Sequence, residues 1–321
     1  MKITLEKVHG SMNTFYMVDG EERDDYANLA LQLCAKDQGV DGLLVILPSN
    51  SAHAKMRVFN RDGSEASMCG NGLRCVARYV CEKEGVDEAV IETMKADLAV
   101  RREETLMDGI ETYSVQISPV SFQLKDLPME YDNQTTLIQQ AIPEISEEIM
   151  FSAVAVPNPH LIGIVPEEIQ KSPEHQKKWA EKFNGQNNYF SDGVNVSYVT
   201  KVGQGIFVRT YERGVGFTNA CGTAMTASAL ISCMSDMVPF GEVAVYNPGG
   251  MVKCTVNKSG DTFELLLTGN ATRLSVHEFQ WEEEQVDSEF TAFEILDEQR
   301  QYEKFIEEIS VVVEQFAKRK E

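Results

Sequence analysis

A spacing that occurs twice in the sequence constrains the fold most strongly. The same intervals separate a charged or polar strand residue from a cysteine in each half of the chain: Asn60 to Cys69 and Glu212 to Cys221, and Arg57 to Cys69 and Arg209 to Cys221. Equal spacing over several elements rarely arises by chance. We therefore predict two structural repeats, one in each half of the chain.

Apolar alternation around the two cysteines predicts strands in matching order. The predicted strands of the first half lie at 3–9, 14–18, 43–47 and 54–60, and those of the second half at 153–165, 194–199 and 209–212. A helical pattern follows each cysteine. The predicted fold is α/β (α+β), with two pseudo-symmetric domains, each a mixed and mainly antiparallel sheet wrapped on a central helix that begins at its cysteine.

The predicted domain organisation has four parts. The two repeats occupy residues 1–120 and 151–270, a linker of loop and short helix occupies 121–150, and a return segment with a helical tail occupies 271–321. The tail is acidic from about residue 287 to 320 and carries an apolar stripe at helical spacing. We expect it to pack on the body of the protein or on a second subunit, since none of its residues suggests chemistry.

Charge and cysteine usage exclude several classes of function. The chain of 321 residues has 29 Lys and Arg against 50 Asp and Glu, a net charge of −21, which disfavours nucleic acids and anionic membranes. It shows no membrane-spanning run and no signal-peptide pattern, so a cytoplasmic location is expected. Its seven cysteines include no C-x-x-C pair. We therefore expect free thiols and neither disulfides nor a metal site.

A cysteine at a helix N-terminus has a favourable electrostatic setting. Unpaired backbone N–H groups and the helix dipole stabilise a thiolate there and lower the pKa of the thiol. Two such thiols on opposite sides of one substrate would remove a proton from a carbon and return one to its other face. The amides of Gly70-Asn71 and Gly222-Thr223 would bind the substrate carboxylate and the charge that develops on it.

Other interpretations of the cysteines remain open at this point. A single cysteine at a helix start is more often a small buried residue than a catalyst, and only the duplication favours catalysis. A cysteine hydrolase would need a histidine, for which His160 is the candidate, and would leave the second cysteine unexplained. A thiol–disulfide redox protein and a small-molecule-binding module are further alternatives. The remaining cysteines lie on apolar faces and are predicted core residues: Cys34, Cys75, Cys81, Cys233 and Cys254.

Several motifs together resemble the diaminopimelate epimerase family, in order from about residue 3 to 275. They are His9-Gly10-Ser11-Met12-Asn13-Thr14-Phe15, Phe59-Asn60-Arg61-Asp62-Gly63-Ser64, Met68-Cys69-Gly70-Asn71-Gly72-Leu73-Arg74-Cys75, Pro157-Asn158-Pro159-His160, Val194-Asn195-Val196, Tyr211-Glu212-Arg213-Gly214-Val215-Gly216 and Ala220-Cys221-Gly222-Thr223. The resemblance implies two similar α/β domains and a cofactor-independent two-base epimerase that interconverts LL- and meso-2,6-diaminopimelate for lysine and peptidoglycan synthesis. It also suggests a homodimer.

The resemblance assigns roles to individual residues. Cys69 and Cys221 would be the acid–base pair. The residues that would hold the amino and carboxylate ends of the substrate, or donate backbone N–H groups to it, are Asn13, Asn60, Gly70, Asn71, Asn158, His160, Asn195, Glu212, Arg213, Gly222 and Thr223. A carboxylate can hold an ammonium group, and an arginine can bind a carboxylate through two hydrogen bonds.

The chain departs from the family pattern at three positions near these motifs. Phe217 stands where the family often has Glu, Ala224 where it often has Gly, and Gly42 where it often has Gln. The tail beyond about residue 278 has no recognised counterpart. Substrate identity is therefore less constrained than reaction type, and a racemase of another amino acid, such as histidine, is the alternative on the same fold.

Overall fold

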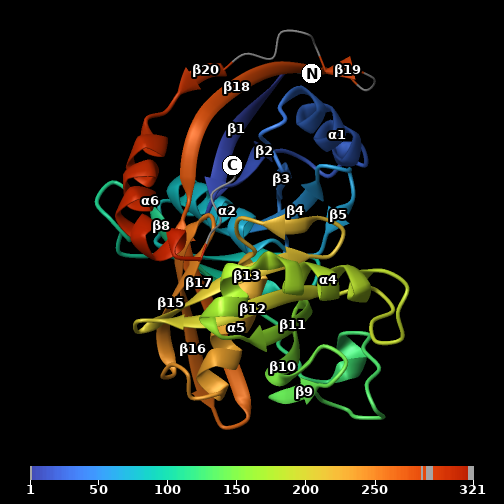
Figure 1. The fold of residues 1–321 in the computed structure, drawn as a ribbon. Coiled ribbons are helices and arrows are strands. Elements are labelled where there is room, and N and C mark those ends of the chain that lie inside the picture. Colours follow the sequence, from blue (N-terminus) through green and yellow to red (C-terminus); the bar gives the residue numbers. More distant parts are fainter. Residues whose placement is uncertain (1, 283–284, 287–291, 317–321) are drawn as a thin grey trace. The chain divides into compact units, whose positions relative to one another are not determined.

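The computed structural model describes residues 2–282, 285–286 and 292–316 (Figure 1). The chain divides into two compact units. Unit 1 comprises the described residues of Met1–Gln116 and Thr268–Ile306, and unit 2 those of Ile117–Leu267 and Glu307–Glu321.

Unit 1 contains two helices early in the chain and strands from both ends of the sequence. The helices are α1 (Tyr26–Lys36) and α2 (Gly70–Glu84). The strands are β1 (Lys2–Gly10), β2 (Asn13–Asp19), β3 (Gly42–Leu47), β4 (Ala54–Asn60), β5 (Glu65–Ala66), β6 (Glu88–Glu92), β7 (Asp97–Arg102), β8 (Thr112–Ile117), β18 (Thr272–Glu282), β19 (Gln285–Val286) and β20 (Ala292–Ile295).

Unit 2 contains the second set of strands and helices. The helices are η1 (Leu124–Asp126), α3 (Glu167–Lys171), α4 (Pro173–Asn184) and α5 (Gly222–Met234). The strands are β9 (Gln140–Ile142), β10 (Ser146–Val156), β11 (Asn158–Ile164), β12 (Asn195–Val202), β13 (Gly205–Glu212), β14 (Gly216–Thr218), β15 (Gly241–Asn247), β16 (Gly250–Ser259) and β17 (Thr262–Asn270). The boundary between the units falls within β8, β17 and the C-terminal helix α6 (Glu298–Glu314).

The two units share one order of strand pairing, which confirms the predicted repeat. In unit 1, β1–β2 is antiparallel, β2–β3 parallel, β3–β4 and β4–β5 antiparallel, β4–β6 parallel and β6–β7 antiparallel. In unit 2, β10 to β16 follow the same sequence of pairings, from the β10–β11 hairpin to the antiparallel β15–β16 pair. Helices α2 and α5 occupy the same place in this order.

Both central helices are largely buried, although α2 carries polar residues such as Asn71 and Arg74 whereas α5 is apolar or small. In α5 every residue from Gly222 to Cys233 is buried, so the helix is apolar or small on all sides, as expected for a helix enclosed by a sheet. Helix α2 is buried from Gly70 to Ala77 and ends at Gly85, whose left-handed φ of 68° provides the C-cap. The predicted core cysteines are all buried free thiols, which confirms that prediction.

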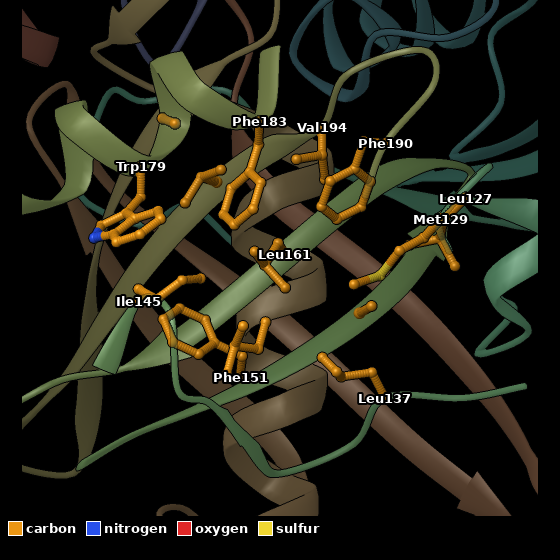
Figure 2. Packing of buried hydrophobic residues seen from close by; sticks show 14 of the residues in the cluster. Leu127, Met129, Leu137, Ile145, Phe151, Leu161, Trp179, Phe183, Phe190 and Val194 are labelled. Atoms are coloured by element: carbon orange, nitrogen blue, oxygen red, sulfur yellow. The ribbon is translucent and has the colours of Figure 1, made fainter. Parts of the chain in front are cut away.

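Unit 2 has a second apolar layer between α4 and strands β10 and β11. Figure 2 shows Trp179 and Phe183 projecting from α4 toward Leu161 of β11, with Phe151 of β10 close by. Loop residues 124–137 contribute further apolar side chains to the same cluster. The segment 121–150, predicted as a linker of loop and short helix, also contains β9 and the start of β10.

The C-terminal segment returns to unit 1 before its last helix. Strand β18 pairs antiparallel with β1 along its length and with β20 on its other side. The tail was predicted to be helical from about residue 287 to 320, and the structure has α6 at Glu298–Glu314 after the short strand β20. Residues 287–291 and 317–320 lie outside the described residues. Tyr302 and Phe305 are buried in unit 1, whereas Val313 and Phe316 are buried in unit 2.

Candidate active site

Cys69 is the N-cap residue of α2, as predicted from the sequence. Its backbone is extended, with φ −141° and ψ 109°, and its sulfur accepts a hydrogen bond from the Gly72 amide at 3.4 Å. Gly70 and Asn71 are the first helical residues, so their N–H groups have no intrahelical acceptor. A partly buried sulfur that accepts a backbone N–H at a helix start has one contact that stabilises a thiolate.

Asn13 and Asn71 meet the thiol within unit 1. The Cys69 sulfur donates to Oδ1 of Asn13 at 3.7 Å, and Nδ2 of Asn71 donates to the same oxygen at 3.3 Å. Nδ2 of Asn13 in turn donates to the Asp41 carboxylate at 2.7 Å, which also accepts from the Thr14 amide. Sequence reasoning identified Asn13 and Asn71 but missed Asp41, which fixes the orientation of the Asn13 amide.

Arg74 is a second residue that sequence reasoning missed as part of this half-site. Its side chain is fully buried at 0% exposure and donates to Oδ1 of Asn71, to the Ser11 hydroxyl and to the Asn270 carbonyl. These hydrogen bonds compensate the cost of burying a guanidinium group. The only sequence signal was its place in the motif, one helical turn after Asn71.

Asn60 lies at the exposed end of β4 and hydrogen-bonds to Ser64, with Nδ2 to Oγ at 3.0 Å. It pairs across the strands with Gly42. A Cβ atom at Gly42 would lie 2.2 Å from the Phe59 carbonyl oxygen, so the backbone at this position accommodates only glycine. No hydrogen bond between Asn60 and the Cys69 group is recorded among the described residues.

Cys221 is the N-cap residue of α5, again as predicted. Its φ is −119° and its ψ 109°, and its sulfur lies 3.6 Å from the Thr223 hydroxyl. Gly222 and Thr223 begin the helix, so their amides occupy the same place as those of Gly70 and Asn71. Both cysteines are N-caps of equivalent helices, so the repeat seen in the strand topology extends to the candidate catalytic residues.

The electrostatic setting of Cys221 differs from the sequence expectation. Burial raises the pKa of the thiol well above its usual value, and the negative charge of Glu212 raises it further. Hydrogen bonds from Thr223 and from the Ala224 amide lower it by less. The expectation that the helix start lowers the pKa of Cys221 is therefore wrong, because desolvation and a nearby carboxylate outweigh the helix terminus.

Glu212 is held in place by Thr218, the residue after Phe217, at which this chain differs from the family pattern. The Thr218 hydroxyl donates to Oε1 of Glu212 at 2.5 Å, across the β13–β14 pair. Phe217 is 38% exposed, packs edge-on against Tyr211 at 5.1 Å and lies under the Arg209 guanidinium. Phe217 thus packs on neighbouring side chains of β13, while Thr218 supplies the polar contact to Glu212.

His160, Asn158 and Asn195 lie on one face of the unit 2 sheet. Residues 158 and 160 point to the same side of β11, and His160 is paired in register with Asn195 on the parallel strand β12. His160 is fully buried, and neither ring nitrogen has a hydrogen-bond partner among the described residues. Burial, with the charge of Arg213, lowers the pKa of His160 to about 3.

Arg213 follows the end of β13, and its backbone ties it to Asn195. The Arg213 amide donates to Oδ1 of Asn195 at 3.0 Å, and its guanidinium donates to the Asp192 carbonyl at 3.1 Å. The guanidinium keeps further donors for an anionic group. Unit 2 thus brings together Asn195 with Arg213, and Cys221 with Thr223 and Glu212.

The described residues contain no group of three or more His, Cys, Asp or Glu side chains placed to hold a metal ion. A cavity of about 530 Å³ lies in unit 2, and none of the predicted site residues lines it. Its lining comes from two loop segments: residues 123–125, 128–130 and 134–135, and residues 187–189 and 191. No helix in the described part of the chain is long and apolar enough to cross a membrane.

The sequence profile of the diaminopimelate epimerase family matches residues 5–108 and 152–274, which cover both cysteine half-sites. This chain belongs to the diaminopimelate epimerase family. The diaminopimelate epimerase of Listeria welshimeri is 47% identical, with 96% of this chain and 97% of that protein aligned. The diaminopimelate epimerase of Enterococcus faecalis is 46% identical over 85% of this chain and 87% of its own length.

Solved structures share the fold at low sequence identity. A phenazine biosynthesis protein of the PhzF family from Bacillus anthracis superposes with a TM-score of 0.64 at 16% identity, covering 88% of this chain and 100% of its own. A hydroxyproline epimerase from Agrobacterium vitis superposes with a TM-score of 0.57 at 14% identity, covering 86% of this chain and 92% of its own. This structural similarity supports the assignment of the two-repeat α/β fold to this chain.

Proposed function

We propose that this protein is a cofactor-independent epimerase that interconverts LL- and meso-2,6-diaminopimelate. The observation that carries the proposal is the equivalent placement of Cys69 and Cys221, each the N-cap of the central helix of its repeat. Relatives named diaminopimelate epimerase, at 46–47% identity over most of the chain, support the substrate.

The proposed reaction inverts one stereocentre with two thiols. One cysteine, as thiolate, removes the proton from the substrate α-carbon and becomes a thiol. The other cysteine, as thiol, donates its proton to the opposite face of the resulting carbanion and becomes a thiolate. The N–H groups of Gly70-Asn71 and Gly222-Thr223 stabilise the carboxylate as negative charge develops on it. Each turnover leaves the two cysteines with exchanged protonation states.

The surroundings of the two sulfurs suggest which cysteine is the acid and which is the base before substrate binds. The raised pKa of Cys221 favours its thiol form, so Cys221 enters as the acid toward one isomer. The Cys69 sulfur accepts the Gly72 amide at a helix start, a contact that stabilises a thiolate, so we assign Cys69 the role of base. In its thiol form the same sulfur donates to Oδ1 of Asn13. The assignment applies to the two cysteines before substrate binds.

The polar residues of unit 2 suit the ends of an amino-acid substrate. Glu212 can accept hydrogen bonds from an ammonium group, and Arg213 can bind a carboxylate. The ring nitrogens of His160 have no hydrogen-bond partner in the part of the chain that the structure describes, so the ring is suited to a polar substrate group. Asn13, Asn60, Asn158 and Asn195 supply further donors and acceptors. A site with this many paired polar groups rejects analogues that leave them unpaired.

Solvent-proton exchange tests the proposal directly. Purified protein, without added cofactor, is incubated with LL-diaminopimelate in deuterated water, and the α-hydrogen is followed by NMR. We expect deuterium at the α-carbon of both isomers as meso-diaminopimelate forms. Cys69→Ala and Cys221→Ala should each abolish inversion, and substantial inversion by either variant would remove the two-base scheme.

Further assays separate the alternatives. Because Phe217 and Gly42 depart from the family pattern, a racemase of another amino acid, such as histidine, is the second candidate, and a panel of amino acids decides between them. A cysteine hydrolase would form a covalent acyl intermediate that mass spectrometry detects, and a binding module would bind substrate without exchange. A bifunctional thiol reagent that bridges Cys69 and Cys221 would support a shared substrate site.

We infer a cytoplasmic homodimer from the family resemblance. A biosynthetic role in making lysine and peptidoglycan precursors, together with seven free cysteines, supports a reducing compartment. Light scattering of the purified protein would measure its oligomeric state, and a mass matching one chain would contradict the dimer.

A further inference from the structure

Helix α6 is anchored to unit 1 by a partly buried ion pair at its first residue. The Glu298 carboxylate accepts two hydrogen bonds from Arg78 of α2, at 2.7 and 2.8 Å, and one from the Arg273 amide at 2.9 Å. The two hydrogen bonds make the pairing bidentate, and the side chains of Arg78 and Glu298 are 8% and 29% exposed. The start of α6 is therefore fixed against the helix that Cys69 caps.

The next residue of α6 fixes the hydrogen-bonding state of His9. Oε1 of Gln299 lies 2.9 Å from Nε2 of His9. The amide nitrogen of Gln299, Nε2, donates to the Glu303 carboxylate at 3.1 Å. Because a carboxylate only accepts, the amide nitrogen faces Glu303 and the oxygen faces His9. The His9 Nε2 atom therefore carries the hydrogen. Burial lowers the pKa of His9 to about 4, so the ring is neutral near pH 7.

The other ring nitrogen of His9 holds the turn that precedes Asn13. Nδ1 accepts from the Met12 amide at 3.2 Å and lies 3.2 Å from Nδ2 of Asn270. Asn270 also accepts from the Ser11 amide at 2.8 Å. Ser11 and Met12 both have positive φ, 53° and 63°, a conformation that non-glycine residues adopt only where surrounding contacts impose it.

This turn sets the position of Asn13 at the Cys69 thiol. Asn13 is the next residue after Met12, and its Oδ1 accepts from the Cys69 sulfur. We propose that Gln299 is a positioning residue, which holds His9 in the Nε2–H tautomer so that the Ser11–Met12 turn places Asn13 against Cys69. Helix α6 thus fixes the positions of Asn13 and Cys69 through contacts that involve no substrate.

The packing of α6 supports the positioning role of Gln299, because a second side chain of the same helix also contacts His9. Tyr302, one turn after Gln299, packs edge-on against the His9 ring with centroids 4.8 Å apart and planes at 68°. Both α6 side chains that reach His9 therefore constrain its ring, one by a hydrogen bond and one by contact. The family profile ends at residue 274, before this helix begins.

The effect of Gln299 on catalysis rests on the proposed function, but its effect on the surroundings of Cys69 does not. The test therefore measures the reactivity of the thiol and not turnover. The probe is iodoacetamide, and mass spectrometry measures the alkylation rate of the Cys69 and Cys221 peptides separately at pH 7. Gln299→Met keeps the side-chain length but removes the acceptor. We expect Cys69 to react at least twofold faster, because its sulfur loses a fixed acceptor, while Cys221 reacts at its original rate. Gln299→Glu, which keeps an acceptor oxygen, should restore the original rate.

Two further variants keep the test decisive. Lys304→Ala changes an exposed residue of the same helix and should leave both rates unchanged. If Gln299→Met folds poorly, Gln299→Asn carries the same expectation, since its shorter side chain no longer reaches Nε2 of His9. An unchanged Cys69 rate in the folded acceptor-free variant, or equal changes at Cys69 and Cys221, would overturn the proposal. Absence of α-proton exchange with diaminopimelate would overturn the proposed function alone.

Discussion

The amide oxygen of Asn13 lies 3.7 Å from the Cys69 sulfur and accepts its hydrogen bond. The same oxygen accepts from Asn71, and the Asn13 nitrogen donates to Asp41. The thiol is therefore held by a side chain at the start of β2 rather than by its own helix alone. Strand pairing between β1 and β2 therefore sets the position of the Asn13 amide beside this sulfur.

Removal of the Asn13 side chain should weaken catalysis more than stability. Asn13→Ala deletes the acceptor of Cys69 and of Asn71, and we expect kcat/KM for diaminopimelate to fall by about tenfold, the equivalent of one hydrogen bond worth about 1.4 kcal/mol. Steady-state kinetics measure the change. Asn257→Ala, an exposed substitution in β16, is the matched control and should retain full activity. Equal kinetics for the two variants would contradict the role of Asn13.

The charge of Glu212 should control the ionisation of Cys221. In Glu212→Gln the amide still accepts from Thr218, but the negative charge that raises the pKa of Cys221 is absent. The thiol pKa should fall, so alkylation of Cys221 at a fixed pH below that pKa should become faster. The pH profile of Cys221 alkylation measures this, with Glu181→Gln on α4 as the control. A profile that does not move would argue against the electrostatic contact.

Two glycines of unit 1 should differ in their tolerance of a methyl group. Gly42→Ala places Cβ 2.2 Å from the Phe59 carbonyl, a backbone atom that cannot move aside, and should lower the free energy of unfolding by about 1–3 kcal/mol. Gly72→Ala meets only the tip of the Leu44 side chain and gains helix propensity of about 1 kcal/mol, so its net change should be small. Urea unfolding measures both, and equal losses would contradict this reading of the contacts.

Burial of neutral His160 should make stability depend on pH. Its folded pKa of about 3 lies below the unfolded value of 6.5, so the unfolded chain binds the extra proton between these values. Stability from this group is complete above pH 6.5 and is lost as pH falls toward 3, with a slope of up to about 1.4 kcal/mol per pH unit. His160→Gln should reduce the slope of unfolding free energy against pH in this range. An unaltered slope would mean that His160 is protonated in the fold.

Local patterns in the sequence determined the repeat and the place of each cysteine within it. The equal intervals to Cys69 and Cys221, with helical patterns after both, predicted two sheets with central helices, and both cysteines are the N-caps of those helices. Strand and helix periods depend on neighbouring residues, so a repeated pattern yields a repeated local structure. The burial of the other five cysteines followed from the same periodicity.

Tertiary structure alone decided the surroundings of the thiols. Pairing of β1 with β18 brings Asn270 and α6 to His9, contacts between residues about 260–290 positions apart that no local period encodes. The pKa of Cys221 depends on how deeply α5 is buried and on where β13 places Glu212, and these outweigh the helix terminus that sequence reasoning relied on. Hydrogen bonding and desolvation act through space, so only the folded chain fixes which groups surround each sulfur.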